Sequence, residues 1–178
     1  MSEGSAGRLV LLRHAKSAWP DVADHERPLG PRGLRDAPAA GRWLRDADCV
    51  PALVICSTAR RARETWALAA GQLGAAVPVR FDERVYAAEP EELLEVVSGV
   101  PREVGTLLLV GHNPGLADLA VSLARKAVDA AEAGAIARLS EKFPTSAIAV
   151  LACPGSWQEL APGSARLTDF AVPRGVAR

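Results

Sequence analysis

The hydrophobic pattern of the chain alternates between short apolar runs and longer amphipathic segments. Four runs are apolar at consecutive positions, as buried strands of a mostly parallel sheet are, and they cover residues 8–12, 52–56, 106–110 and 146–153. Residues 77–81 predict a weaker strand near an edge of the sheet. Residues 165–172 alternate between apolar and polar side chains, which predicts a late antiparallel strand.

Helical spacing of apolar residues occurs between these runs, over residues 33–47, 58–73, 89–100 and 114–134. Pro38 indicates that the first helix either starts close to Asp36 or kinks there. Strands that alternate with helices predict an α/β fold, with a mostly parallel central sheet and helices on both faces. We expect a single domain over residues 8–178, preceded by a polar, disordered tail at residues 1–7.

Composition limits the classes of function. Lys plus Arg and Asp plus Glu both number 21, whereas nucleic-acid-binding modules are usually basic, so we expect no nucleic-acid partner. No apolar stretch reaches membrane-spanning length, and the first residues lack the pattern of a signal peptide. The three cysteines fit no metal-binding spacing, and Cys56 is expected to be a small buried residue. These features favour a cytoplasmic protein with no membrane partner.

Polar residues follow three of the predicted strands. Arg13 and His14 follow the first, the arginine-rich segment "CSTARRARET" ends the second and enters a helix, and "GHNPG" with His112 follows a later one. In open α/β sheets, ligands bind beyond the carboxyl ends of the strands. Guanidinium groups and helix N-termini both suit phosphate oxygens. The three segments together predict an anion pocket that contains a titratable nucleophile.

Each segment alone also has an ordinary structural explanation. A lone histidine after a strand more often packs than catalyses, and three arginines on one helical turn usually form a solvated face. The segment "GHNPG" could be a tight turn at a helix start, and His25, in a polar loop, is expected at the surface. The functional interpretation therefore depends on all three segments lying at equivalent strand ends.

The motifs at these strand ends resemble the histidine phosphatase superfamily, also called the phosphoglycerate-mutase-like superfamily. The resemblance lies in "RHA" at 13–15, in "STARRARET" at 57–65, which fits the pattern S-x-x-x-R-A-x-x-T, and in the Gly-His pair of "VGHNPG". The segments "RHAKS", "ERPLGPRG" and "EKFPTSAIAVL" resemble the phosphohistidine phosphatase branch, the SixA-like proteins. The resemblance implies the phosphoglycerate-mutase-like fold.

The resemblance also implies roles for four residues. His14 would be the nucleophile that receives the phosphoryl group, and Arg13, Arg61 and His112 would bind its oxygens. Arg61 is the arginine in register with the motif, so its neighbours Arg60 and Arg63 are expected on the outer side of the helix. Neither a metal nor another cofactor is implied.

The chain departs from the family pattern at one position. Mutases and broad phosphatases of the superfamily carry a glutamate as general acid, and the equivalent position here falls on Ala87. Glu83 and Glu89 are nearby but out of register, and whether either serves as the acid stays open. Glu89 also precedes a proline, as a residue at a helix start does. Residues 126–146 show no pattern that assigns them a role.

The leading hypothesis is a phosphatase that hydrolyses phosphohistidine or related phosphorylated substrates through a covalent phosphohistidine on His14. Its partner would be a phosphorylated protein or a small phosphorylated molecule. One alternative is a phosphatase or mutase of small phosphate esters on the same fold. Another is a non-catalytic module that binds phosphate or a phosphoprotein, although such a module does not need the nucleophile His14.

Overall fold

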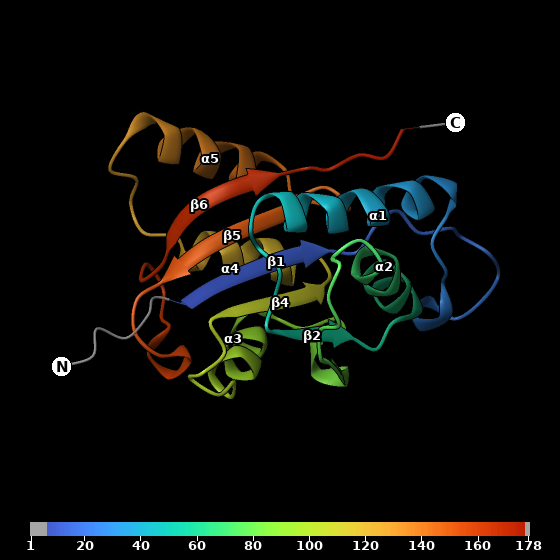
Figure 1. Cartoon of the computed structure of the whole chain (residues 1–178), viewed down its shortest axis with the longest axis horizontal. Helices are drawn as coiled ribbons and strands as arrows, with labels where there is room; N and C mark the ends of the chain where they lie inside the picture. Colours follow the sequence, from blue (N-terminus) through green and yellow to red (C-terminus); the bar gives the residue numbers. More distant parts are fainter. Residues whose placement is uncertain (1–6, 177–178) are drawn as a thin grey trace.

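The computed structural model describes residues 7–176, which form a six-stranded sheet with helices around it (Figure 1). The strand order is β3-β2-β4-β1-β5-β6. The strands are β1 (Gly7–Arg13), β2 (Leu53–Ser57), β3 (Val79–Asp82), β4 (Thr106–Gly111), β5 (Ile148–Cys153) and β6 (Arg166–Ala171). The first four strands pair in parallel, and β5 and β6 are antiparallel additions. The predicted mostly parallel sheet is confirmed, with β3 at one edge.

Helices cover both faces of this sheet, as the sequence predicts. They are α1 (Pro31–Asp46), α2 (Arg60–Ala70), α3 (Pro90–Ser98), α4 (Gly115–Leu123) and α5 (Ala130–Glu141). Short 3-10 turns lie at η1 (Asp24–Glu26), η2 (Glu83–Val85) and η3 (Trp157–Glu159). None of the helices within residues 7–176 is long and apolar enough to cross a membrane.

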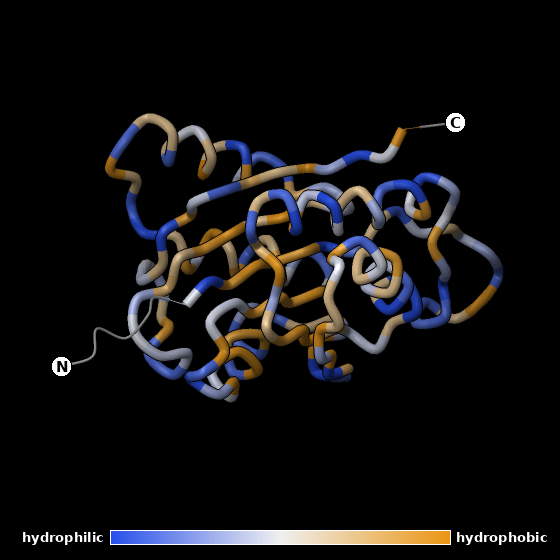
Figure 2. Tube along the Cα trace, viewed as in Figure 1, coloured by the Kyte–Doolittle hydropathy of each residue, from blue (hydrophilic) through white to orange (hydrophobic). Residues whose placement is uncertain are grey.

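The two faces of β1 explain why both layers of helices form. Leu9 and Leu11 pack into one core cluster with residues of α3, α4 and α5, whereas Val10 and Leu12 pack into another with residues of α1 and α2. All four side chains are fully buried, and burying each contributes roughly 1.5–3 kcal/mol. The apolar residues follow the strands through the centre of the molecule (Figure 2). Cys56 lies in the second cluster, where burial raises the pKa of its thiol to about 12, which agrees with the predicted small buried residue.

The long helix predicted over residues 114–134 is wrong, because the chain divides into α4 and α5. Ala124 ends α4 in an extended conformation and forms a parallel bridge with Ala165, just before β6. Asp129 then caps α5, because its side chain accepts a 2.8 Å hydrogen bond from the backbone N–H of Glu132. The alanine-rich sequence favours helix locally, but the pairing with a distant segment prevails.

Two other boundaries differ from the predictions. Helix α1 begins at Pro31, where a proline suits the first helical position, and it therefore starts well before Asp36 and contains Pro38. Of the tail expected at residues 1–7, residues 1–6 lie outside the described part of the chain, and Gly7 is the first residue of β1.

Candidate active site

The three predicted segments meet beyond the carboxyl ends of the parallel strands. Arg13, the last residue of β1, is in register with Gly111, the last residue of β4, and the backbone N–H of His14 donates to the Gly111 carbonyl at 3.1 Å. A cavity of about 220 Å³ opens beyond these strand ends. Its lining residues are Arg13, His14, Lys16, Ser17, Trp19, Arg27, Arg61, His112, Asn113 and Thr145. All four residues that the sequence selects therefore line the same cavity.

His14 is held as a neutral imidazole with one free nitrogen. Its Nδ1 lies 2.8 Å from the Ala15 carbonyl oxygen, so Nδ1 carries the proton and donates it, and Nε2 keeps its lone pair. Burial first, and then the neighbouring His112, Arg61 and Arg13, lowers the pKa of His14 to about 3. At neutral pH, Nε2 is therefore an unprotonated nitrogen in a cationic pocket.

His112 lies beside His14, with their ring centroids 5.1 Å apart. Its Nε2 is 2.7 Å from Ser57 Oγ, and that hydroxyl already accepts the backbone N–H of Ala59 at 3.2 Å. The Ser57 hydroxyl proton can then be donated to His112 Nε2, which places the imidazole proton on Nδ1. Burial first, and then the charge of Arg61, lowers the pKa of His112 to about 4.

Several buried polar atoms around the cavity have no hydrogen-bond partner among residues 7–176: Arg13 Nε, His112 Nδ1 and Asn113 Oδ1. Arg13 is otherwise oriented by a 3.1 Å bond from Nη1 to the Phe143 carbonyl, which also accepts from Asn113 Nδ2 at 2.7 Å. Leaving a buried donor unpaired costs free energy. The N–H groups of Arg13 and His112 therefore suit an anion with several oxygens.

Arg61 is the arginine of α2 that turns inward. It is 7% exposed, whereas Arg60 and Arg63 are exposed. Arg60 pairs with Glu64 at 2.8 Å, and Arg63 Nε donates to the Thr58 carbonyl at 2.9 Å. The predicted division between one inward and two outward arginines is confirmed.

Asp24 fixes Arg61, and the sequence analysis missed it. Its backbone carbonyl accepts from Arg61 Nη1 at 2.7 Å and its Oδ2 accepts from Arg61 Nη2 at 3.1 Å. The carboxylate also accepts from Tyr86 Oη at 2.6 Å and from Arg27 Nη1 at 3.0 Å. These bonds, that of Tyr86 first, hold the pKa of Asp24 well below its usual range. The ionised carboxylate thus orients two arginines that line the cavity.

His25 lies closer to the cavity than its polar loop indicates. Its side chain is half-buried, and its Nε2 is 2.9 Å from Thr58 Oγ1. Its ring packs edge-on against Tyr86, which in turn packs edge-on against His112. The predicted surface position is therefore only partly right, because a tertiary contact with Tyr86 covers one side of the ring.

Trp19 and Arg27 form the mouth of the cavity and were also missed. The Arg27 guanidinium lies 3.3 Å from the centroid of the Trp19 ring, within cation–π range, and Trp19 is 76% exposed. Arg27 is itself buried and donates to the Ser17 hydroxyl and to the Ala18 carbonyl. Single exposed aromatic residues give little signal in a sequence, so only the fold places this pair at the site.

Among residues 7–176, no carboxylate lines this cavity. Ala87 is exposed and has a φ of 54°. Glu83 is an exposed residue that begins η2, and Glu89 is the N-cap of α3, in a capping box with Glu92. The expectation that Glu89 starts a helix is therefore confirmed. Within residues 7–176, no group of three or more His, Cys, Asp or Glu side chains is arranged to hold a metal ion.

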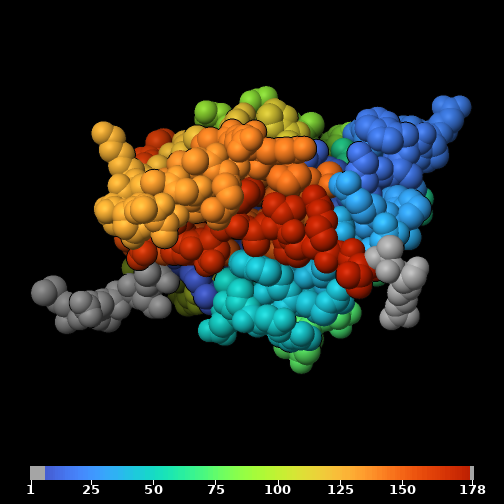
Figure 3. All heavy atoms as spheres, turned by 90° about the horizontal axis from the view of Figure 1, so that it is seen from above, coloured from blue at the N-terminus to red at the C-terminus, as the bar shows by residue number. Residues whose placement is uncertain are grey.

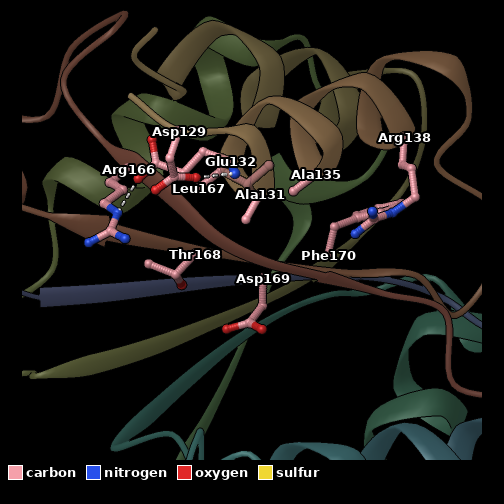
Figure 4. Close-up of a pocket in the computed structure, with 10 residues that line it drawn as sticks. All are labelled: Asp129, Ala131, Glu132, Ala135, Arg138, Arg166, Leu167, Thr168, Asp169 and Phe170. Carbon is pink, nitrogen blue, oxygen red and sulfur yellow. Dashed lines mark hydrogen bonds and ion pairs between the residues drawn. The ribbon is translucent and has the colours of Figure 1, made fainter. Parts of the chain in front are cut away.

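A larger cavity, of about 340 Å³, lies away from the strand ends, between α5 and β6 (Figure 4). Glu132 points into this region from α5 and pairs with Arg166 and Arg125. Because the buried carboxylate is satisfied by these arginines, we interpret the cavity as part of the packing of α5 on the sheet. Residues 126–146 thus contribute α5 to this cavity and Thr145 to the first one.

Comparison with known proteins agrees with this geometry. The sequence profile of the histidine phosphatase superfamily (branch 1) matches residues 9–86. The uncharacterized protein Rv1276c of Mycobacterium tuberculosis is 48% identical over 164 residues, which cover 92% of this chain and 100% of that protein. The SixA structure from Nakamurella multipartitia has a TM-score of 0.81 at 37% identity, over 94% of this chain and 96% of that one. A protein histidine phosphatase SixA solved with tungstate has a TM-score of 0.75 over 93% and 97% of the two chains; at 18% identity, this likeness concerns the fold alone.

The chain belongs to the histidine phosphatase superfamily. Within the superfamily it falls in the SixA-like branch. The family model and the SixA-like structures together support phosphatase activity.

Proposed function

We propose that this phosphatase hydrolyses phosphohistidine, through a covalent phosphohistidine formed on its own His14. The observation that carries the proposal is the state of His14: its proton is fixed on Nδ1 by Ala15, and Nε2 is unprotonated among cationic side chains. Arg13, Arg61 and His112 would bind the phosphoryl oxygens. No metal or other cofactor has a part in this proposal.

In the first step, His14 Nε2 attacks phosphorus, and the bond between phosphorus and the leaving nitrogen breaks. The leaving imidazole takes the electron pair of that bond and is neutralised by a proton from solvent. Charge spreads over the equatorial oxygens in the transition state, and positioned cations stabilise it, which is the main catalytic task in phosphoryl transfer. Arg13, Arg61 and the Nδ1–H of His112 would supply this stabilisation.

In the second step, water attacks the phosphohistidine. The oxygen–phosphorus bond forms, the bond to His14 Nε2 breaks with its electron pair returning to that nitrogen, and inorganic phosphate leaves with both protons of the water, which it then exchanges with solvent. The Ala15 carbonyl keeps Nδ1 protonated throughout, so His14 returns to its starting tautomer. A covalent intermediate replaces one difficult displacement with two easier ones.

The cavity lining favours a leaving group that needs no acid from the protein. An alkyl phosphate expels a basic alkoxide, and a positioned acid typically supplies roughly 10²–10⁴-fold in rate for such a step. In the described part of the chain, residues 7–176, no carboxylate lines the cavity, and Ala87 stands where related enzymes would carry the acid. Phosphohistidine leaves as imidazole, which solvent can protonate before the bond breaks.

The size of the cavity supports a protein substrate. Pockets that enclose drug-sized molecules measure about 300–1,000 Å³, and this one measures about 220 Å³. A phosphoryl group fits inside, and a larger leaving group would stay at the mouth beside the exposed Trp19. The buried, unpaired thiols and the zero net charge support action in the cytoplasm, without nucleic acid or membrane.

A side-by-side activity assay tests this proposal. The purified protein is given a histidine-phosphorylated protein, an aryl phosphate and an alkyl sugar phosphate, each with and without excess chelator. We expect kcat/KM to fall in that order, because the leaving group becomes more basic along the series, and we expect chelation to have no effect. Efficient hydrolysis of the alkyl phosphate would instead favour the small-ester phosphatase. Binding of vanadate without turnover of any substrate would favour the non-catalytic module.

A further inference from the structure

The segment after β6 crosses α1 and reaches the side of the proposed active site. We call residues 172–176 the C-terminal strap. In the view from above, the red C-terminal part of the chain, which includes β6, runs between the orange segment that contains α5 and the cyan segment that contains α1 (Figure 3). The strap belongs to no helix or strand, so side-chain and backbone bonds must hold it in place.

Asp36 of α1 is the anchor of the strap. Its carboxylate is 1% exposed and accepts from the backbone N–H of Gly175 at 2.9 Å and from Arg174 Nη1 at 2.8 Å. Arg32 Nε lies 3.5 Å from the same carboxylate. A Cβ atom at position 175 would lie 2.2 Å from the Arg35 carbonyl oxygen, so only glycine allows the strap to approach the helix this closely.

The same two arginines also hold the loop that precedes β5. Arg174 Nη1 donates to the Thr145 carbonyl at 2.8 Å, and Arg32 Nη2 donates to Thr145 Oγ1 at 2.9 Å. Thr145 lines the cavity that contains His14. The strap and α1 therefore fix this loop from its outer side.

The inner side of the loop contacts the phosphate-binding residues. The Phe143 carbonyl accepts from Arg13 Nη1 at 3.1 Å. The backbone N–H of Ser146, a residue with a φ of 66°, lies 3.1 Å from the carbonyl oxygens of both Arg13 and His14. A shift of residues 143–146 would therefore move the acceptor that orients the Arg13 guanidinium.

We propose that Arg174 and Asp36 are positioning residues, and that the C-terminal strap holds residues 143–146 so that Arg13 faces the phosphoryl group. Without Arg174, the buried Asp36 carboxylate loses a charge-assisted bond and the Thr145 carbonyl loses its donor. A misplacement of about 1 Å far from the chemistry can cost roughly 10²-fold in rate. The strap proposal rests on the proposed function for the role of Arg13 in binding the phosphoryl group. The contacts of residues 143–146 are independent of that function.

The first test measures the affinity of the full chain for inorganic phosphate by calorimetry. Arg174→Ala should weaken binding about tenfold, which corresponds to about 1.4 kcal/mol. Arg174→Lys should recover part of the loss, because a lysine retains a charge and a donor but not the fork. Arg102→Ala is the matched control and should bind as the wild type does, because Arg102 is exposed and its side chain makes no hydrogen bond within residues 7–176.

Two further measurements separate positioning from a general loss of stability. In an Arg13→Ala background, Arg174→Ala should cost little additional phosphate affinity, because residues that act as a unit are not additive. In the ligand-free protein, Arg174→Ala should accelerate amide hydrogen exchange over residues 143–147 and leave β4 unchanged. Unchanged exchange over 143–147, or an equal loss of affinity with and without Arg13, would overturn the strap proposal. A wild-type protein that binds no phosphate would contradict the proposed function. Amide hydrogen exchange over residues 143–147 would in that case still test whether the strap holds the loop.

Discussion

At the scale of single residues, the site depends on two histidines that are kept neutral. His14 and His112 are 7% and 9% exposed, and the arginines around them oppose a further positive charge. Burial is the largest cause of the lowered pKa in both. The environment that keeps His14 and His112 neutral therefore has a consequence for stability in acid.

Stability should fall on acidification because of these two histidines. Their folded pKa values of about 3 and about 4 lie below the value of about 6.5 expected in the unfolded chain. Between these limits the unfolded chain binds more protons, so the stabilisation is complete above pH ~6.5 and is lost as the pH falls. Each histidine can remove up to ~1.4 kcal/mol per pH unit in this window. Urea unfolding of the wild type and of His14→Gln at neutral pH and near pH 5 measures this. The variant should lose less stability, and parallel losses would contradict the assignment.

The sequence predicts part of the site and misses the rest for a physical reason. Arg13 ends β1, and His14 and His112 directly follow β1 and β4. Arg61 lies in the first turn of α2, the helix that follows β2. The carboxyl ends of parallel strands lie side by side, so the order of elements alone predicts that these residues meet. Asp24 begins the short 3-10 turn η1, in a polar segment without periodicity, and its contacts with Arg61 and Tyr86 join segments far apart in the chain. Such contacts depend on tertiary packing and have no local pattern.

At the scale of elements, the start of α1 packs directly on the loop that follows β1. A Cβ atom at Gly33 would lie 2.1 Å from the Lys16 carbonyl oxygen, and that oxygen accepts from the backbone N–H of Gly30 at 2.9 Å. Gly33 therefore permits the contact that places Lys16 and its neighbours at the cavity.

Gly33→Ala should destabilise the protein by roughly 1–3 kcal/mol, because the added methyl group must displace backbone atoms. Gly134→Ala in α5 is a matched control, since a Cβ there would meet only Arg138 Nη1, at 3.9 Å. An alanine in an open helical position should stabilise by roughly 0.8–1 kcal/mol. Thermal unfolding of both variants measures the difference. Equal shifts of Tm would show that Gly33 is not needed for close packing.

The same scale explains which elements the sequence predicts well. The four apolar runs become β1, β2, β4 and β5. A strand that is buried on both faces is apolar at consecutive positions, and this pattern is visible in the strand's own sequence. The division between α4 and α5 is missed, because the bridge between Ala124 and Ala165 joins segments that are distant in sequence. Helix propensity depends on neighbouring residues in the sequence and therefore does not predict such a pairing.

At the scale of the whole molecule, a chain with no net charge concentrates positive charge beyond the carboxyl ends of its parallel strands. The parallel strands bring three separate segments to those ends, and antiparallel β5 and β6 lead the chain back across α1 to Asp36. The site is thus built from most of the chain rather than from one motif.

The central claim is that His14 carries the phosphoryl group during turnover, and trapping the intermediate tests it most directly. The protein is mixed with a protein substrate that carries labelled phosphohistidine, quenched in alkali and mapped by mass spectrometry. We predict an acid-labile phosphoryl group on His14, absent in His14→Ala, a variant that should fold but show no turnover. A label on His112, or continued turnover by His14→Ala, would contradict the account.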